Sequence, residues 1–150
     1  MQTLVKAAGG NVITCPIKET GFYDPDGNRY AVELSQQGLN DPLLSGIPAT
    51  APVFQLHGQT VELNERIVLL GSGAGSQCTN QIVKVGPKAY GLQSHFEMTS
   101  ALFSSWLDLD IDLSNMNHDR LESEFAEISE RYRSIGLTLF RNFLRLAELI

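Results

Sequence analysis

The sequence predicts an α/β domain, because strand-like segments fill residues 11–97 and helix-like segments fill residues 99–146. The first block holds short runs of β-branched and aromatic residues separated by Gly, Pro, Asn and Asp. In the second block, apolar residues recur at every third or fourth position. With 150 residues, 43% of them hydrophobic, the chain can bury a core of its own. We therefore expect one domain over residues 1–150.

The first elements follow from local signals. A short helix is predicted over residues 3–8, because Gly9-Gly10 is a typical helix end. An apolar strand over residues 11–15 is expected to end at Pro16. The turn Asp24–Asn28 should join two strands in a hairpin. Further strands are predicted over residues 52–58, 66–70, 81–85 and 89–93, and the last two should pair with each other.

Two helices are predicted after the strands. Thr99 or Ser100 can cap the first, and Asn117 can cap the second. The second helix carries an apolar stripe that suits packing on a sheet, formed by Leu121, Phe125, Ile128, Tyr132, Ile135 and Leu139. Gly136 lies within this helix and could kink or break it. The glycine-rich stretch 71–75 lacks the Gly-Lys-Ser/Thr ending of a phosphate-binding loop, so we expect a flexible connection there.

Composition excludes several classes of protein. The net charge of −6 argues against nucleic-acid binding, which needs a basic face. No apolar run reaches membrane-spanning length, and the first residues lack the pattern of a secretory signal. Cys15 and Cys78 form no metal-finger or Cys-x-x-Cys spacing, so both thiols are expected to be free. These features predict a cytoplasmic location and no membrane partner.

The most informative stretch places His95 and Glu97 two residues apart where a strand runs into a helix. Side chains two apart on a strand share a face, so the carboxylate can orient the imidazole. Such a pair is the base half of a nucleophile–base–orienter triad, whereas a His-x-Glu pair taken alone is most often a surface pair. His57, His95 and Glu97 could instead form a two-His, one-carboxylate metal site. No other feature of the sequence indicates a metal or a cofactor, and we expect none.

Five segments in chain order resemble the class I glutamine amidotransferase domain, in its GMP-synthase-like or stand-alone branch. They are Asp41–Pro48, Phe54–Gln59, Cys78–Gln81, Gly91–Thr99 and Leu139–Leu144. The resemblance implies a doubly wound, flavodoxin-like fold with a mixed sheet and C-terminal helices, of which this chain would be the C-terminal portion. Met1–Gly10 resembles the end of the nucleophile motif and its helix. That register places the family's cysteine before Met1, so the expectation is a truncated domain without its nucleophile.

The resemblance also implies a reaction. The family hydrolyses glutamine to glutamate and ammonia with a Cys–His–Glu triad, and a synthetase partner consumes the ammonia. By position, His95 matches the general base and Glu97 its orienting carboxylate. The glutamine-pocket positions are matched by Gln2, His57, Gly58 and Gln59. His57 could equally be a hydrogen-bonded structural histidine.

Two hypotheses remain open from the sequence. The chain is either part of an amidotransferase, inactive alone and completed by a missing N-terminal segment or a partner, or a non-catalytic binding, regulatory or assembly module. Phe96, Ser94 and Gln59 replace the family's usual proline, aromatic residue and acid, which fits a diverged copy. Loss of central strands would expose an apolar sheet edge to solvent. A second copy of the chain would cover that edge, so we expect a homo-oligomer.

Overall fold

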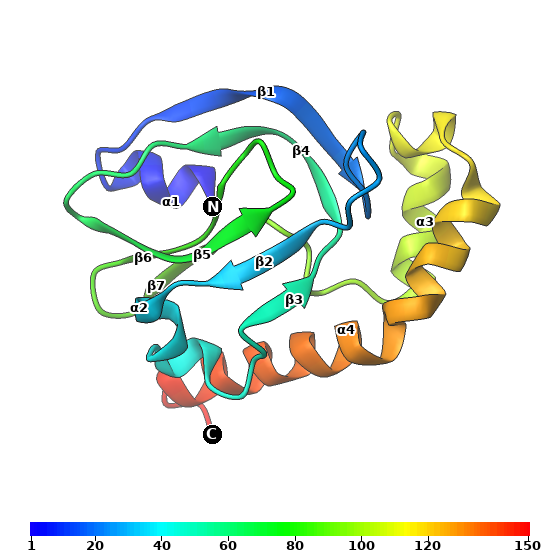
Figure 1. Cartoon of the computed structure of the whole chain (residues 1–150). Helices are drawn as coiled ribbons and strands as arrows, with labels where there is room; N and C mark the ends of the chain where they lie inside the picture. The colour runs from blue at the N-terminus through cyan, green and yellow to red at the C-terminus, as the bar shows by residue number, and fades with distance from the viewer.

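The computed structural model describes all residues, 1–150, as strands flanked by helices on two sides (Figure 1). The strands are β1 (Val12–Gly21), β2 (Ala31–Leu34), β3 (Thr50–Pro52), β4 (Gln55–Val61), β5 (Ile67–Ala74), β6 (Asn80–Val85) and β7 (Ala89–Leu92). The helices are α1 (Gln2–Ala7), α2 (Gln36–Leu39), α3 (Ser100–Leu109) and α4 (His118–Leu146). Two short 3-10 turns, Pro42–Leu44 and Leu113–Asn115, complete the chain.

The strands form two sheets. Five of them lie in the order β3-β2-β5-β6-β7, and β1 pairs only with β4 in a two-stranded ribbon. In Figure 1 this ribbon arches over one side of the larger sheet, while α4 runs along the other. Every pairing is antiparallel. The predicted α/β class with C-terminal helices is confirmed.

Several local predictions are confirmed at residue level. β6 and β7 form the expected hairpin, with Val85 opposite Ala89. The Thr99 side chain caps α3 by accepting a hydrogen bond from the Leu102 amide, and Asn117 caps α4 through the amide of Arg120. At the end of α1, Gly9 has φ of +80°, which is the left-handed conformation that favours glycine after a helix.

One prediction about the first strands is wrong, and another is confirmed only in part. β1 does not end at Pro16 but continues to Gly21, because the ladder with β4 shifts register between Thr14 and Glu19. A proline is tolerated in such an irregularity, where its missing N–H costs no ladder hydrogen bond. The expected hairpin around Asp24–Asn28 is reduced to one bridge between Tyr23 and Arg29. The chain then leaves β1 and enters the other sheet.

The stretch 71–75 is not a flexible loop, since β5 extends to Ala74. Gly71 and Gly73 lie opposite Leu34 and Val32 of β2. A Cβ added at Gly71 would lie only 2.7 Å from the Cγ1 of Val32. Glycine is therefore needed at this position because β5 packs closely against a side chain of β2.

The expected strand over residues 52–58 is split into β3 and β4, which belong to different sheets. Val53 and Phe54 make the crossing and are fully buried. The crossing point is therefore part of the core.

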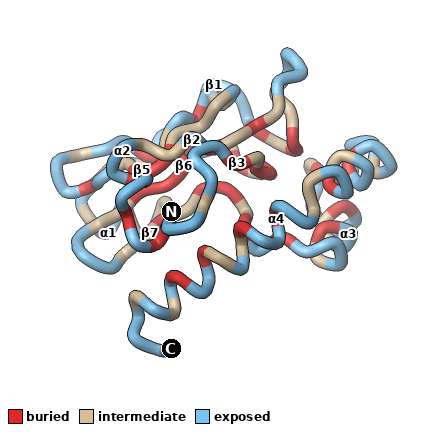
Figure 2. Tube along the Cα trace, turned by 60° about the horizontal axis from the view of Figure 1, so that its bottom comes forward, coloured by how far each residue is buried: buried red, intermediate tan, exposed pale blue.

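Three apolar clusters make up the core. One packs β2, β5 and β6 against α4, and another joins α3 and α4 to Phe22 and Phe54. A smaller cluster lies under α1 around Val5. Figure 2 shows buried positions along the strands and at intervals along α4. None of the helices combines the length and the apolar composition that crossing a membrane requires.

Gly136 neither kinks nor breaks α4, which runs without interruption to Leu146. Its position is set by packing: a Cβ at Gly136 would collide with the backbone oxygen of Phe96. Glycine thus lets α4 approach the segment that carries His95 and Glu97.

We predict that Gly136→Ala destabilises the protein. Alanine gains about 1 kcal/mol of helix propensity over glycine, but overpacking against rigid backbone costs about 1–3 kcal/mol. Urea unfolding should show a net loss of stability. Ser134→Ala, on the exposed face of the same helix, is the matched control and should change stability little. A Gly136→Ala protein more stable than wild type would contradict the close contact.

Candidate functional site

His95 and Glu97 lie in the segment between β7 and α3, and their side chains are in contact. The Nδ1 of His95 is 2.7 Å from the Oε1 of Glu97. The imidazole also packs edge-on against Trp106 of α3, with ring centroids 4.9 Å apart. The side chain of His95 is 30% exposed, and its Nε2 has no hydrogen-bond partner in the protein. One ring nitrogen is thus held by the carboxylate while the other is free to exchange a proton.

The buried Tyr132 of α4 fixes the backbone at this site. Its hydroxyl donates to the carbonyl oxygen of His95 at 2.8 Å and accepts from the amide of Phe54 at 3.1 Å. Burial raises the pKa of Tyr132 well above its ordinary value, so the hydroxyl keeps its proton. α4 therefore ties the His95 segment to the point where the two sheets meet.

The hydrogen bond from His95 lowers the pKa of Glu97 below its ordinary value. The carboxylate is consequently ionised around neutral pH. An ionised carboxylate at Nδ1 favours the tautomer with its proton on that nitrogen, which leaves Nε2 as a base.

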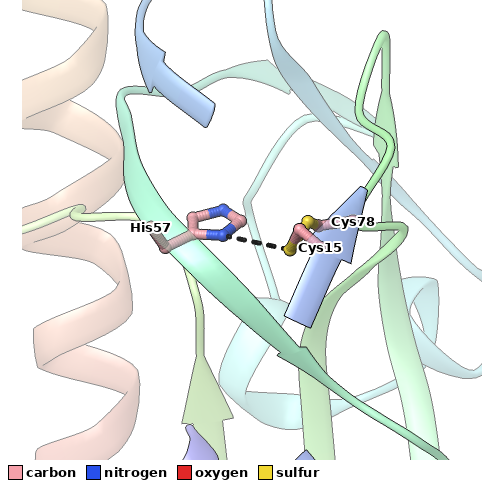
Figure 3. A group of neighbouring side chains, drawn as sticks. All are labelled: Cys15, His57 and Cys78. Atoms are coloured by element: carbon pink, nitrogen blue, oxygen red, sulfur yellow. Dashed lines mark hydrogen bonds between the residues drawn. A yellow bond between two sulfur atoms is a disulfide. The ribbon is translucent and has the colours of Figure 1, made fainter. Parts of the chain in front are cut away.

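A second group lies inside the molecule, where Cys15, His57 and Cys78 meet (Figure 3). The two cysteines form a disulfide, so the prediction of free thiols is wrong. Their Cα atoms lie 5.7 Å apart although 63 residues separate them in sequence, which is an ordinary separation for a bridged pair. The fold brings β1 against the turn that precedes β6, a contact with no local sequence signal.

His57 of β4 is held beside the cysteines. Its Nδ1 lies 4.0 Å from the Sγ of Cys15, while its Nε2 lies 3.0 Å from the Oε1 of Gln55. An amide oxygen can only accept, so Nε2 carries the proton and the lone pair of Nδ1 faces the sulfur. Burial lowers the pKa of His57, which keeps the ring neutral. His57 is thus a buried, hydrogen-bonded residue, and its contact with glutamine stays a prediction.

A buried polar network around this group was not predicted from the sequence. Glu19 is 1% exposed and accepts hydrogen bonds from the amides of Gln77 and Cys78. Gln81 donates to the carbonyl oxygen of Cys78 at 2.8 Å and accepts from the hydroxyl of Ser94 at 2.8 Å. Gln81 directly precedes the apolar residues Ile82-Val83 of β6, and a polar residue in that place was an available signal.

The remaining predicted pocket residues make no hydrogen bond to His95 or Glu97. Gln2 is the half-buried first residue of α1, and Gln59 is an exposed residue of β4 that follows Gly58. The carbonyl oxygen of Gln59 accepts a hydrogen bond from Gln93 at 3.3 Å. No hydrogen bond joins Gln2, Gly58 or Gln59 to His95 or Glu97, so their role in glutamine binding stays a prediction.

The alternative metal site of His57, His95 and Glu97 does not form. The group of potential ligands that the fold brings within 4.8 Å of one another is Cys15, His57 and Cys78. Glu97 is committed to His95 instead.

Comparison with known proteins gives one curated relative and several solved structures. The chain is 31% identical over 98 residues to the glutamine amidotransferase-like protein YfeJ of Salmonella typhimurium, covering 65% of this chain and 37% of that protein. A glutamine amidotransferase of Thermotoga maritima superposes with a TM-score of 0.78 at 21% identity, over 95% of this chain and 58% of that one. A GMP synthase subunit protein of Thermoplasma acidophilum gives a TM-score of 0.62 at 17% identity, over 97% of this chain and 52% of that one. No known family profile matches the chain.

The resemblance to class I glutamine amidotransferases is therefore confirmed, through sequence in the Salmonella protein and through fold in the solved structures. The chain spans 37% of the curated relative and 52–58% of these two structures. The activity and the partners of the whole relatives are therefore proposals, and not findings, for this chain.

The pair of His95 and Glu97 predicts a specific pH dependence of stability. Because the folded pKa of Glu97 is lowered, its ionised form contributes stability above the unfolded pKa of about 4.3, and this is lost as pH falls through the folded value. Glu97→Gln should therefore lower the unfolding free energy at pH 6, and the difference from wild type should shrink at pH 3. Urea melts across this range measure it. A difference independent of pH would contradict the assignment.

Proposed function

We propose that this glutamine amidotransferase-like chain supplies the general base, His95, and its orienting carboxylate, Glu97, to a Cys–His–Glu glutaminase site. The observation that carries the proposal is the held Nδ1 and free Nε2 of His95. Gln2 and the β4 residues His57, Gly58 and Gln59 are assigned to the glutamine side of the site by their resemblance to the family. A cytoplasmic location is part of this proposal.

The geometry suits one kind of reaction. A thiolate attacks the side-chain carbonyl carbon of glutamine, and the C–N bond breaks to give an acyl-enzyme and ammonia. Nε2 of His95 takes the thiol proton and returns it to the departing nitrogen, while Glu97 stabilises the imidazolium that forms between these steps. Water then releases glutamate from the sulfur, with His95 again accepting a proton.

We infer that the attacking thiol comes from neither cysteine of this chain. Cys15 and Cys78 are bonded to each other, and both lie against His57. We infer that the nucleophile belongs to a segment outside residues 1–150, in line with the 37% of the Salmonella protein that the chain spans. The chain alone should then be inactive.

An ammonia acceptor is also required by such a reaction. The likeness in fold to a GMP synthase subunit protein supports a separate synthetase as the partner. The acceptor itself stays open.

A second candidate function is a non-catalytic binding, regulatory or assembly module. Three apolar clusters close within the chain, and this supports a domain that folds by itself. In such a module the contact between His95 and Glu97 would be a surface ion pair.

We predict that the purified chain releases no ammonia from glutamine, because no thiol faces Nε2 of His95. A coupled glutamate dehydrogenase assay of the chain checks this. The native protein is then isolated from its own cells, together with any segment or partner that supplies the thiol. In that product, His95→Ala should lower kcat by about 10²–10⁴, as for loss of a general base.

The control is His118→Ala, which removes an imidazole at the start of α4 and should leave kcat unchanged. Ammonia release by the isolated chain would overturn the inferred outside thiol. A native product of 16.5 kDa without glutaminase activity would favour the non-catalytic module.

The predicted homo-oligomer has a candidate interface. A groove of about 640 Å³ lies between β7 and the second half of α4 and is lined mostly by apolar side chains. Phe140 and Phe143 on its rim are 59% and 46% exposed. β7 is also an edge strand with one unpaired side.

We predict that light scattering shows a dimer or larger species at high protein concentration, since association would cover this groove. Phe140→Asp should shift the protein toward monomer. Leu109→Asp, at a leucine 83% exposed on α3, is the matched control and should not. A wild-type protein that stays monomeric would contradict the proposed interface.

A further inference from the structure

Cys15 and Cys78 have no part in the proposed glutaminase site, and together with His57 they have the composition of a metal site. Two sulfurs and an imidazole nitrogen from three separate segments lie within 4.8 Å of one another. Tetrahedral zinc, with Zn–S of about 2.3 Å and Zn–N of about 2.0 Å, places neighbouring ligand atoms about 3.3–3.8 Å apart. Small side-chain adjustments would bring the three atoms to this spacing.

The surroundings of His57 favour metal binding. Metal-bound histidines usually donate their other N–H to an oxygen, which fixes the tautomer and the ring orientation. Here Gln55 accepts from Nε2 at 3.0 Å, and the lone pair of Nδ1 faces the Sγ of Cys15 at 4.0 Å. In Figure 3 the imidazole edge points toward the two sulfurs.

The local charge favours a divalent cation. Glu19 is buried, and its Oε2 lies 3.5 Å from the Nε2 of His57, outside the ligand set itself. No lysine or arginine pairs with Glu19. Two cysteine thiolates beside it would add negative charge in a region of low dielectric, which is costly without a cation.

The group lies beneath a surface hollow but is closed off from it. The hollow, of about 650 Å³, is lined by the residues on both sides of each cysteine, namely Thr14, Pro16, Gln77 and Thr79. The cysteines themselves are buried, at 6% exposed for Cys15 and 0% for Cys78.

We propose that Cys15, His57 and Cys78 bind one zinc ion when both sulfurs are thiolates, and that the disulfide is the metal-free form. A dithiol reductant supplies the two electrons and two protons that convert the disulfide to two thiols and becomes a disulfide itself. Zn²⁺ then displaces the two thiol protons and takes the Nδ1 of neutral His57 as its third protein ligand. A non-protein ligand completes the tetrahedron. Soft thiolates with one imidazole select zinc over magnesium or calcium.

Cobalt substitution and native mass spectrometry test the site. The chain is reduced with a phosphine, freed of metal, and titrated with Co²⁺ and then with Zn²⁺. We expect one Co²⁺ per chain with sulfur-to-cobalt charge-transfer absorption, bleached by Zn²⁺. The zinc form should gain the mass of one zinc less two protons. The oxidised chain, of identical sequence, should show neither signal.

Variants separate this site from other ligands on the chain. Cys15→Ser and Cys78→Ser should each abolish the charge-transfer band, and His57→Ala should weaken binding by at least about tenfold. His118→Ala removes an imidazole elsewhere and should bind like wild type. Circular dichroism of each variant checks folding.

Three outcomes would overturn the proposal: no band in the reduced wild type, equal binding by the oxidised chain, or a Cys15→Ser protein that is folded and binds like wild type. None of these signals depends on glutaminase activity. The zinc site and the proposed function can therefore fail separately.

Discussion

The hydroxyl of Tyr132 makes the interaction on which the arrangement of the molecule depends. One hydrogen bond holds the carbonyl oxygen of His95, and the other holds the amide of Phe54. Both partners belong to irregular backbone that no strand ladder satisfies. A buried backbone group left without a partner costs about 1–3 kcal/mol, so α4 supplies a contact that the strands cannot. The long helix thus sets the position of the base relative to the crossing between the two sheets.

Asn142, nearer the C-terminal end of α4, also hydrogen-bonds backbone that lies outside the strands. Its buried side chain donates to the carbonyl oxygens of Leu43 and Ser45, which follow β2 in the chain. Gly136 lies between Tyr132 and Asn142 and allows the helix to approach the backbone of Phe96. Three positions on one helix therefore contact two segments that lie outside the strands.

The two candidate sites are joined through the buried network. Gln81 connects the carbonyl oxygen of Cys78 to the hydroxyl of Ser94, and Ser94 directly precedes His95. Gln55 follows Phe54 in the chain and accepts a hydrogen bond from Nε2 of His57. The chemistry at the cysteines and the placement of the base thus share a common scaffold, and His57, which the family resemblance assigns to the glutamine pocket, belongs to both sites.

Local signals in the sequence were sufficient for much of the fold. The caps at Thr99 and Asn117, the β6–β7 hairpin and the apolar stripe of α4 each depend on residues close in sequence. The contact between His95 and Glu97 was predicted from strand geometry, but the pair lies in the turn after β7, outside any strand. The contact forms there because the two residues are close in sequence.

The rest depends on contacts between distant segments. The β1–β4 pairing, the disulfide across 63 residues and the burial of Glu19 are set by how the whole chain closes. Pro16 and the glycines of residues 71–75 were misinterpreted because their usual effect on local structure is overridden by a register shift and by tight strand packing. At His57 the sequence left a glutamine-pocket role and a hydrogen-bonded structural role both open. The structure places the side chain in a buried network, and its contact with glutamine stays a prediction.

The crossing between β3 and β4 consists of Val53 and Phe54 alone. Side chains alternate between the two faces of a strand, so the length of this link decides which residues of β4 point inward. One extra residue there would turn Gln55 and His57 toward the cluster of α3 and α4, against which Leu56 now packs, and would bring Leu56 to the other face. The cysteines would then face a leucine, and Ser94 would lose its hydrogen bond to Gln55 while keeping the one to Gln81. The spacing of two residues is therefore as much a determinant of the interior chemistry as the identity of the side chains.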